Sequence, residues 1–236
     1  MNLLAFDTST ERLSVAVQRA DGRRFEHAGA GGPQASQALI PTVQALLAQA
    51  GLPLDALRAI VFGRGPGSFT GLRTACSVAQ GLAYGARGGA GVPVLPVDTL
   101  LAVAEAARRS HGATQVLALL DARMGEVYTA EYAWSPAVGW QTLADAAVLP
   151  PEALAAPPAG TLLAGNVPAV YDNRLPDAVR ALPRADVLPT ADALLTLAPA
   201  LLAAGRAVPA EQALPLYIRD KVAQTTTERS AAGLAR

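Results

Sequence analysis

The chain contains very few residues of several kinds, and each shortage excludes a class of protein. Cys76 is the single cysteine among 236 residues, so an internal disulfide is excluded and a reducing cytoplasm is expected. No apolar run approaches the roughly 20 residues that cross a bilayer. The chain runs directly into an apolar strand pattern without a basic region, so we expect neither a secretory leader nor contact with a membrane.

Charged and catalytic side chains are scarce as well. The 19 basic and 19 acidic residues cancel, which predicts no bulk attraction to free nucleic acid or to an anionic membrane. The two histidines, His27 and His111, lie far apart, and no cluster of histidine, cysteine and carboxylate has the spacing of metal ligands. Ser68 has no histidine nearby in sequence to serve as its base. We therefore predict neither a catalytic residue nor a metal site.

Apolar residues make up 51% of the chain, and they follow a pattern that occurs twice. The strand pattern Leu3–Asp7 ends in an acid followed by small hydroxyl residues, and a second strand pattern, Leu13–Val17, follows the turn. The same order recurs at Val116–Asp121 and Val127–Tyr132. A weaker pair, in which glycine and proline hold the same places, joins residues 60–66 and 162–168. Two pairs in one order indicate internal duplication, and hence an α/β fold of two stacked lobes with a cleft between them.

The lobe boundaries are assigned from where this pattern restarts. We place the first lobe at residues 1–105, completed by about 206–220, and the second at residues 106–205, with a mobile tail over 221–236. The periodicity predicts helices over 34–50, 69–87, from Asp98 or Thr99 to about Arg109, over 150–156, and from Thr190 to Ala204. A last short strand is predicted over 216–218.

Residues 63–73 form the most distinctive segment of the chain. Five of these eleven residues are glycine or proline, and they separate the strand pattern Ala59–Phe62 from a helix for which Ser68 is a plausible N-cap. A junction of this kind exposes the first amides of a helix and can hold an anion. It can equally be only a tight corner between a strand and a helix, and both interpretations stay open.

The helix after this junction is unusually rich in glycine and alanine. Glycine inside a helix costs about 1 kcal/mol relative to alanine, so several of them call for a reason, which a closely packed second helix would supply. The alternative is that the helix only lies on its own sheet. The predicted docking face comprises Leu39, Ile40, Val43 and Leu47 on the earlier helix, and Gly71, Thr74, Ala75, Val78, Ala79, Gly81 and Leu82 on the later one.

The cleft between the lobes is predicted to have lost much of a phosphate-binding role. Asp7 is followed by hydroxyl residues, which suit either phosphate contact or a turn that bonds its own amides. Asp121 is instead followed by Ala122, Arg123 and Met124, so the second hairpin lacks the glycine and hydroxyls expected of a phosphate cradle. The candidate vestigial contacts are Asp7, Thr8, Ser9, Arg64, Gly65, Ser68, Asp121 and Arg123.

Several runs of this sequence resemble those of the bacterial TsaB (YeaZ-like) family. They are residues 4–10 (LAFDTST), 63–73 (GRGPGSFTGLR), 79–83 (AQGLA), 121–128 (DARMGEVY) and 215–219 (PLYIR). The resemblance extends to about residue 220 and implies two actin-like lobes of the ASKHA, or ribonuclease H-like, type. Members of the family take part in making threonylcarbamoyladenosine in tRNA. One departure is visible: where the family often has histidine before serine or threonine, this chain has Ala35-Ser36.

The resemblance further implies a non-catalytic cytoplasmic subunit. Its expected partners are a catalytic TsaD-type subunit and a TsaE-type ATPase, with a homodimer when the chain is alone and tRNA contact only within the complex. No intrinsic cofactor is expected, although ATP or ADP could bind weakly at a partner interface.

Three rival functions remain to be weighed. The strongest is a small-molecule kinase or ATPase that uses the cleft, suggested by Asp7 and the glycine-rich corner. A peptidase lacks the nucleophile–base pair or metal ligands that it needs. A free-standing tRNA-binding module is disfavoured by zero net charge, although Arg219, Lys221 and Arg229 could touch RNA within an assembly.

Overall fold

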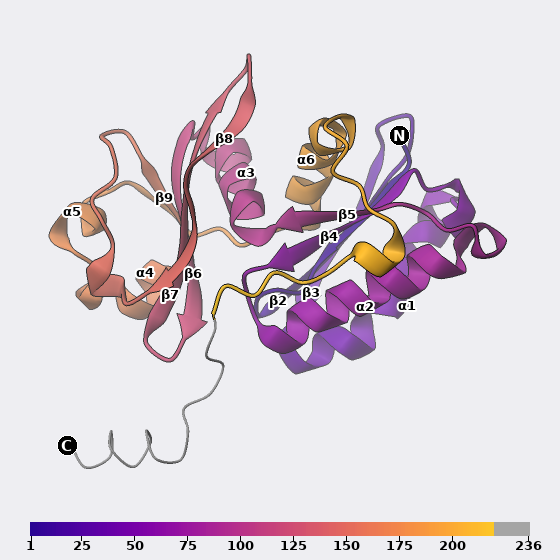
Figure 1. Cartoon of the computed structure of the whole chain (residues 1–236), viewed down its shortest axis with the longest axis horizontal. Helices are drawn as coiled ribbons and strands as arrows, with labels where there is room; N and C mark the ends of the chain where they lie inside the picture. The colour runs from indigo at the N-terminus through magenta and orange to yellow at the C-terminus, as the bar shows by residue number, and fades with distance from the viewer. Residues whose placement is uncertain (220–236) are drawn as a thin grey trace, which may run out of the picture.

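The computed structural model describes residues 1–219, and the tail expected over 221–236 lies outside the described residues. Two five-stranded mixed sheets form two lobes, as the sequence predicted (Figure 1). The first sheet has the order β3 (Arg24–Ala30), β2 (Arg12–Gln18), β1 (Leu3–Asp7), β4 (Ala59–Gly65) and β5 (Val94–Asp98). The second has the order β8 (Gly139–Leu149), β7 (Glu126–Ser135), β6 (Gln115–Arg123), β9 (Leu162–Gly165) and β10 (Arg184–Ala185).

The two sheets share one connectivity. In each, the central strand pairs antiparallel with the strand that follows it and parallel with the strand after the next two, β4 or β9. Asp7 lies opposite Ser14 and Asp121 lies opposite Val127, so both acids end the first strand of a hairpin. The repeated plan that was read from the sequence is therefore confirmed.

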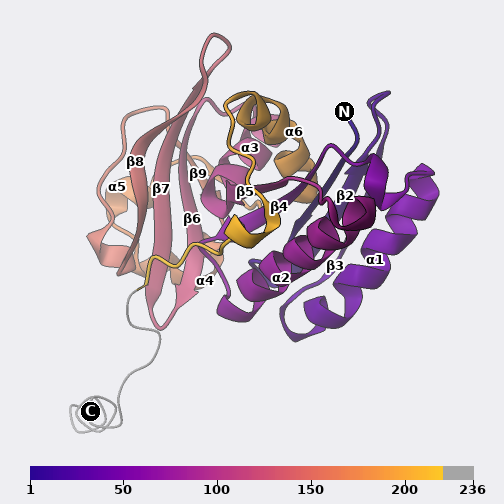
Figure 2. The same ribbon diagram turned by 45° about the vertical axis from the view of Figure 1, so that its right-hand side comes forward.

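Helices cover both faces of the first sheet (Figure 2). One face packs against α1 (Ala35–Ala50) and α2 (Phe69–Gly85), and the other against α6 (Ala191–Ala203) and α3 (Thr99–His111). The helix α1 ends at Ala50, as predicted, and the next residue, Gly51, adopts the left-handed conformation (φ 62°) that glycine tolerates. The Thr190 hydroxyl caps α6 by accepting a hydrogen bond from the Ala193 amide at 3.1 Å.

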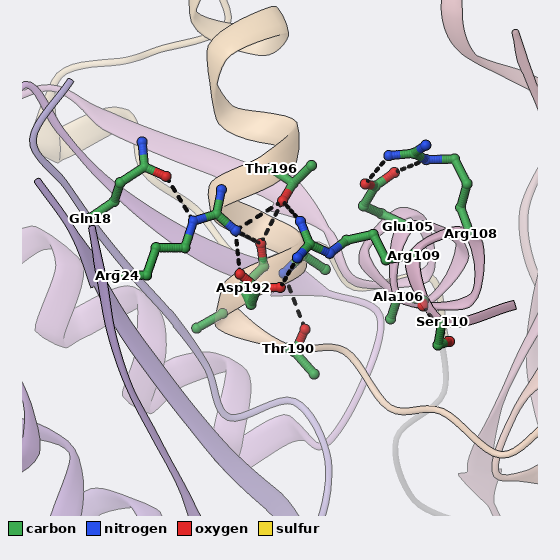
Figure 3. A network of polar contacts seen from close by, with 12 residues as sticks. Gln18, Arg24, Glu105, Ala106, Arg108, Arg109, Ser110, Thr190, Asp192 and Thr196 are labelled. Carbon is green, nitrogen blue, oxygen red and sulfur yellow. Dashed lines mark hydrogen bonds and ion pairs between the residues drawn. The ribbon is translucent and has the colours of Figure 1, made fainter. Parts of the chain in front are cut away.

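The placement of α6 differs from the range expected for the second lobe. Its residues fall within 106–205, yet Leu194, Leu195 and Ala198 pack into the core of the first sheet. A polar network holds it there (Figure 3), in which Asp192 pairs with Arg24 of β3 and, at 2.9 Å, with Arg109 of α3. The chain therefore returns to the first lobe before residue 206. The apolar face of α6 packs there on the face of the first sheet that α1 and α2 leave uncovered.

The second lobe contains a strand that sequence patterning missed. The edge strand β8 is exposed over Gln141–Asp145 and lacks the alternation that reveals a half-buried strand. The expected helix over 150–156 is a single 3₁₀ turn, Pro151–Ala153. The helices after β9 are short: they are α4 (Val167–Tyr171) and α5 (Asp177–Arg180).

The segment after α6 runs along the first lobe and then reaches the second. Val208 bridges to Val94 at the edge of the first sheet, and Ala213 is buried in the core beneath α2. The strand predicted over 216–218 does not form, and this prediction is wrong. The Leu216 amide donates to the Arg64 carbonyl at 2.7 Å, but the segment then crosses between the lobes instead of following β4. Across residues 1–219, no helix combines the length and the apolar character that crossing a membrane requires.

Candidate functional site

A cavity of about 770 Å³ lies between the two lobes. The first lobe contributes the turn after β1, the loop at Gly31–Pro33 and the start of α2. The second lobe contributes the β6–β7 hairpin, and residues 216–219 form a further wall. Its lining includes Ser9, Thr10, Ser68, Phe69, Arg73, Asp121, Arg123, Met124, Asn166 and Tyr217. The predicted cleft therefore exists, and its chemistry depends on which side chains reach it.

Asp7 does not reach the cavity. Its side chain is fully buried, and its Oδ1 accepts hydrogen bonds from the Ser9 amide (2.9 Å) and the Ser9 hydroxyl (2.6 Å). Its Oδ2 is buried without a hydrogen-bond partner among residues 1–219. Burial raises the pKa of Asp7 to about 6, although the two bonds from Ser9 oppose the shift. Burial makes the ionised form of this carboxyl less favourable than in water, and the side chain does not face the cavity.

Glycines make the sealed position of Asp7 possible. A Cβ on Gly63 would lie 1.8 Å from Asp7 Oδ2, so no larger residue fits beside this carboxyl. A Cβ on Gly71 would lie 1.9 Å from the Thr8 carbonyl oxygen, and the buried Thr8 hydroxyl donates to the Gly71 carbonyl at 2.7 Å. The start of α2 is thus packed directly on the β1–β2 turn.

Arg64 and Gly65 also serve the fold outside the cavity lining. Arg64 Nε donates to Asp98 Oδ1 at 2.6 Å, and the Gly65 amide donates to the Thr99 hydroxyl at 3.1 Å. The left-handed φ of Gly65 (122°) brings it against the carbonyl of Leu216, 2.6 Å from where a Cβ would lie. These contacts favour the tight-corner interpretation of residues 63–73.

Asp121 does line the cavity, but contacts with Arg123 and Tyr171 occupy both of its carboxylate oxygens. Oδ1 accepts from the Arg123 amide at 2.8 Å and from the Tyr171 hydroxyl at 2.9 Å, and Oδ2 pairs with the Arg123 guanidinium at 3.0 Å. The side chain of Asn166 accepts from the Asp121 amide at 3.0 Å. Of the eight candidate cleft residues, Ser9, Ser68, Asp121 and Arg123 line the cavity, whereas Asp7, Thr8, Arg64 and Gly65 do not.

The helix α2 presents three faces, and two of them are covered by its own chain. One face packs on the first sheet through Leu72, Ala75, Ala79 and Ala83. A second face contacts residues 213–217 through Phe69, Arg73, Cys76 and Gln80. The third, which comprises Thr70, Thr74, Ser77, Gly81, Tyr84 and Gly85, is exposed or half-buried. A groove of about 450 Å³ lies over the first part of this face, where Thr70, Thr74 and Ser77 line it together with Ser36 of α1 and with Phe69, Arg73 and Val78.

The predicted docking residues divide between the interior and this third face. Leu39, Val43, Leu47, Gly71, Ala75 and Ala79 are buried within the first lobe and cannot contact a partner. This part of the prediction is corrected, because these side chains join α1, α2 and the sheet. Ile40, Thr74, Val78, Gly81 and Leu82 stay exposed or half-buried. A Cβ on Gly81 or Gly85 would meet no atom within 4 Å, so nothing in the described chain requires glycine there.

Sequence reasoning missed the side chains that join the cavity to the groove. Phe69 and Arg73 line both, and Tyr217 contacts both of them. Arg219 was considered only for RNA contact, yet it pairs with Glu126 of β7 at 2.5 Å. The i, i+4 spacing of Phe69 and Arg73 at the start of a helix was the available signal.

Comparison with known proteins places these features in a family context. The family model TsaD, described as tRNA N6-adenosine threonylcarbamoyltransferase, matches residues 32–227. A curated relative from Escherichia coli K12, named tRNA threonylcarbamoyladenosine biosynthesis protein TsaB, is 38% identical over 228 residues, which are 94% of this chain and 96% of the relative. A protein of the same name from Haemophilus influenzae is 44% identical over 54% of this chain and 52% of its own length.

A solved structure agrees with the whole two-lobed arrangement. YeaZ from Pseudomonas aeruginosa superimposes with a TM-score of 0.83 at 43% sequence identity, and the match covers 92% of this chain and 99% of that one. The fold and the sequence therefore point to the same group of proteins.

Proposed function

Because this chain belongs to the TsaB (YeaZ) family, we propose that it acts in tRNA threonylcarbamoyladenosine biosynthesis as a non-catalytic subunit. It docks a TsaD-type threonylcarbamoyltransferase and holds that subunit in an active arrangement, together with a TsaE-type ATPase. In the proposal the chain works in the cytoplasm, forms a homodimer when alone, and meets tRNA only within the complex. A nucleotide, where one binds, does so at the joint with a partner.

The observation that carries the proposal is the open third face of α2. The first lobe covers the other two faces of this helix, and the third contains Gly81 and Gly85, where a Cβ would meet no atom of residues 1–219 within 4 Å. Half-buried Val78 and Leu82 and exposed Ile40 give the face an apolar centre. A partner helix can approach the backbone closely over Gly81 and Gly85, which favours docking of a helical surface.

The acids of the two hairpins support the non-catalytic part. Asp7 is sealed away from the cavity, and the oxygens of Asp121 are bonded to Arg123 and Tyr171. A kinase or ATPase of this architecture needs a carboxylate that faces the bound phosphates. The rival enzyme would therefore have to break existing contacts before it could bind its substrate.

The decisive experiment is reconstitution of tRNA modification from purified proteins. The chain alone should neither hydrolyse ATP nor modify tRNA. It should be required when a TsaD-type subunit, a TsaE-type ATPase, tRNA and threonylcarbamoyl-adenylate are supplied. Equal modification without the chain would overturn the proposal.

A pair of surface variants locates the docking face. Ser77→Arg and Gly81→Leu place bulk on the open face of α2 and should abolish both partner capture and stimulation. Thr142→Arg, an equally exposed change on β8, should leave both intact. Circular dichroism and thermal unfolding confirm that all three variants fold. Unchanged capture by the two α2 variants would place the partner elsewhere.

A further inference from the structure

Residues 213–219, here named the strap, connect the two lobes on the cavity side (Figure 1). On the first lobe, the Ala213 carbonyl accepts from Cys76 Sγ at 3.0 Å and from Gln80 Nε2 at 2.8 Å. The Leu216 amide donates to the Arg64 carbonyl at 2.7 Å. The first half of the strap is thus bonded both to α2 and to β4.

The other end of the strap is anchored on the second lobe. Arg219 Nη2 pairs with Glu126 Oε2 at 2.5 Å and approaches the Arg123 carbonyl at 3.4 Å. The side chain of Arg219 is only 14% exposed, so this ion pair is better shielded from water than an ordinary surface pair. Ile218 packs against the core of the second lobe. A seven-residue segment therefore joins both lobes, and its residues 216–219 form one wall of the cavity.

The middle of the strap touches the wall shared by the cavity and the groove. The ring of Tyr217 lies 5.4 Å from that of Phe69 between centroids, and its hydroxyl accepts from Arg73 Nε at 3.0 Å. The Arg73 guanidinium lies 3.7 Å from the centroid of the Phe69 ring. Each of the three side chains contacts the other two, so a displacement of one must disturb the others.

We propose that the strap is a clamp that sets the opening between the lobes, and that Tyr217 couples this clamp to the docking groove through Phe69 and Arg73. An occupant of the groove that moves either side chain shifts Tyr217, and the shift passes to the ion pair of Arg219 with Glu126, since Arg219 lies two residues further along the chain. The inference rests on the proposed function only for the identity of that occupant. The clamp itself is a property of the isolated chain.

The test measures the distance between the lobes in the isolated chain. Spin labels are attached at Gln37 on α1 and Thr142 on β8, both exposed, in a Cys76→Ser background that keeps a donor for the Ala213 carbonyl. The labelled chain is diluted into an excess of unlabelled chain, so that the distance between the two labels of one chain dominates even in a homodimer. The parent should then give one narrow distance distribution. Arg219→Ala and Glu126→Gln should each broaden it, because each removes one partner of the Arg219–Glu126 ion pair that anchors the strap on the second lobe.

The coupling is tested from the groove side. Arg73→Ala removes the donor and Tyr217→Phe the acceptor of the hydrogen bond between these two residues. Both variants should also broaden the distribution, although neither residue belongs to the second lobe. Ser77→Ala lies in the same groove on the open face of α2 and should leave the distribution unchanged.

Two results would overturn the inference, the first for the clamp and the second for its coupling to the groove. A distribution that stays narrow in a Tyr217→Ala/Arg219→Ala double variant would show that the strap does not hold the lobes. Broadening by Arg219→Ala without broadening by Arg73→Ala would keep the clamp and exclude its coupling to the groove. Since no TsaD-type subunit is present in these experiments, neither result depends on whether the chain activates one.

Discussion

The same hairpin position holds an aspartate in both lobes, and the two aspartates have opposite surroundings. Asp7 does not line the cavity, with one oxygen bonded to Ser9 and the other, beside Gly63, without a hydrogen-bond partner among residues 1–219. Asp121 faces the cavity, but Arg123 and Tyr171 take up its oxygens. A repeated backbone plan therefore does not preserve a repeated chemistry. What decides the chemistry is which side chains lie against each acid: Ser9 in the first lobe, and Arg123 and Tyr171 in the second.

The strands β4 and β9 have a glycine at the same place, Gly63 and Gly165, but the two glycines have different surroundings. In the first lobe, a Cβ on Gly63 would strike a side-chain atom, Asp7 Oδ2. In the second, a Cβ on Gly165 would lie 1.7 Å from a backbone atom, the Leu119 carbonyl oxygen, and Gly165 also has a left-handed φ of 130°. A clash with a side chain can be relieved by substitution, whereas a clash with backbone cannot.

The largest expected effect follows from this difference. Gly165→Ala should lower the free energy of unfolding by roughly 3–5 kcal/mol, from overpacking and backbone strain together. Gly63→Ala should cost roughly 2–3 kcal/mol in the parent, but under about 1 kcal/mol in an Asp7→Ala background, where the struck atom is gone. Denaturant unfolding of the parent, Gly63→Ala, Asp7→Ala and the double variant completes the cycle, and Gly165→Ala is measured beside them. An equal cost of Gly63→Ala in both backgrounds would show that Asp7 does not determine the fit.

The second prediction concerns how pH acts on the sealed acid. Burial raises the pKa of Asp7 to about 6 in the folded state, so between about pH 4 and pH 6 the folded chain binds more protons than the unfolded chain. Stability from this group is therefore present at low pH and lost as pH rises. Relative to Asp7→Asn, the parent should lose about 2 kcal/mol of unfolding free energy between about pH 4.5 and about pH 8.

Urea unfolding over that pH range measures the effect, and a Ser9 variant supplies the control. The bonds from Ser9 lower the pKa of Asp7, so Ser9→Ala should move the midpoint of the pH dependence upward. Parallel stability profiles for the parent and Asp7→Asn would contradict the assignment of a buried, readily protonated carboxyl.

Much of the two-lobed plan was predictable because its signals are local. Alternating strands that end in an acid and a turn identify both hairpins, and Gly51 and Thr190 mark helix ends by their own chemistry. Other features depend on contacts distant in sequence. The apolar pattern of α6 says that the helix is covered but not by which sheet, and the exposed edge strand β8 has no periodic signal.

Site residues show the same limit. A glycine in a helix pattern does not reveal what approaches it: Gly71 lies against the Thr8 carbonyl of its own chain, whereas Gly81 faces open space. Sequence reasoning therefore grouped together residues that the fold separates into a core and an exposed face. The Phe69–Arg73–Tyr217 cluster joins residues about 140 positions apart, which local pattern cannot connect.

The smallest expected effect concerns the helix that follows β4 in the first lobe and β9 in the second. In the first lobe this is the 17-residue α2, and in the second it is the five-residue α4, so only the first lobe presents a long open helix face at this position within the described chain. If nothing in the fold requires Gly81, then Gly81→Ala should raise the unfolding free energy by about 0.5–1 kcal/mol, because alanine has the higher helix propensity. Gly71→Ala is the matched control on the same helix and should destabilise strongly, since its Cβ would lie 1.9 Å from the Thr8 carbonyl oxygen. Denaturant unfolding of the dilute chain measures both. A loss of stability in Gly81→Ala would mean that the chain itself covers this face, and the glycines of α2 would then say nothing about a partner.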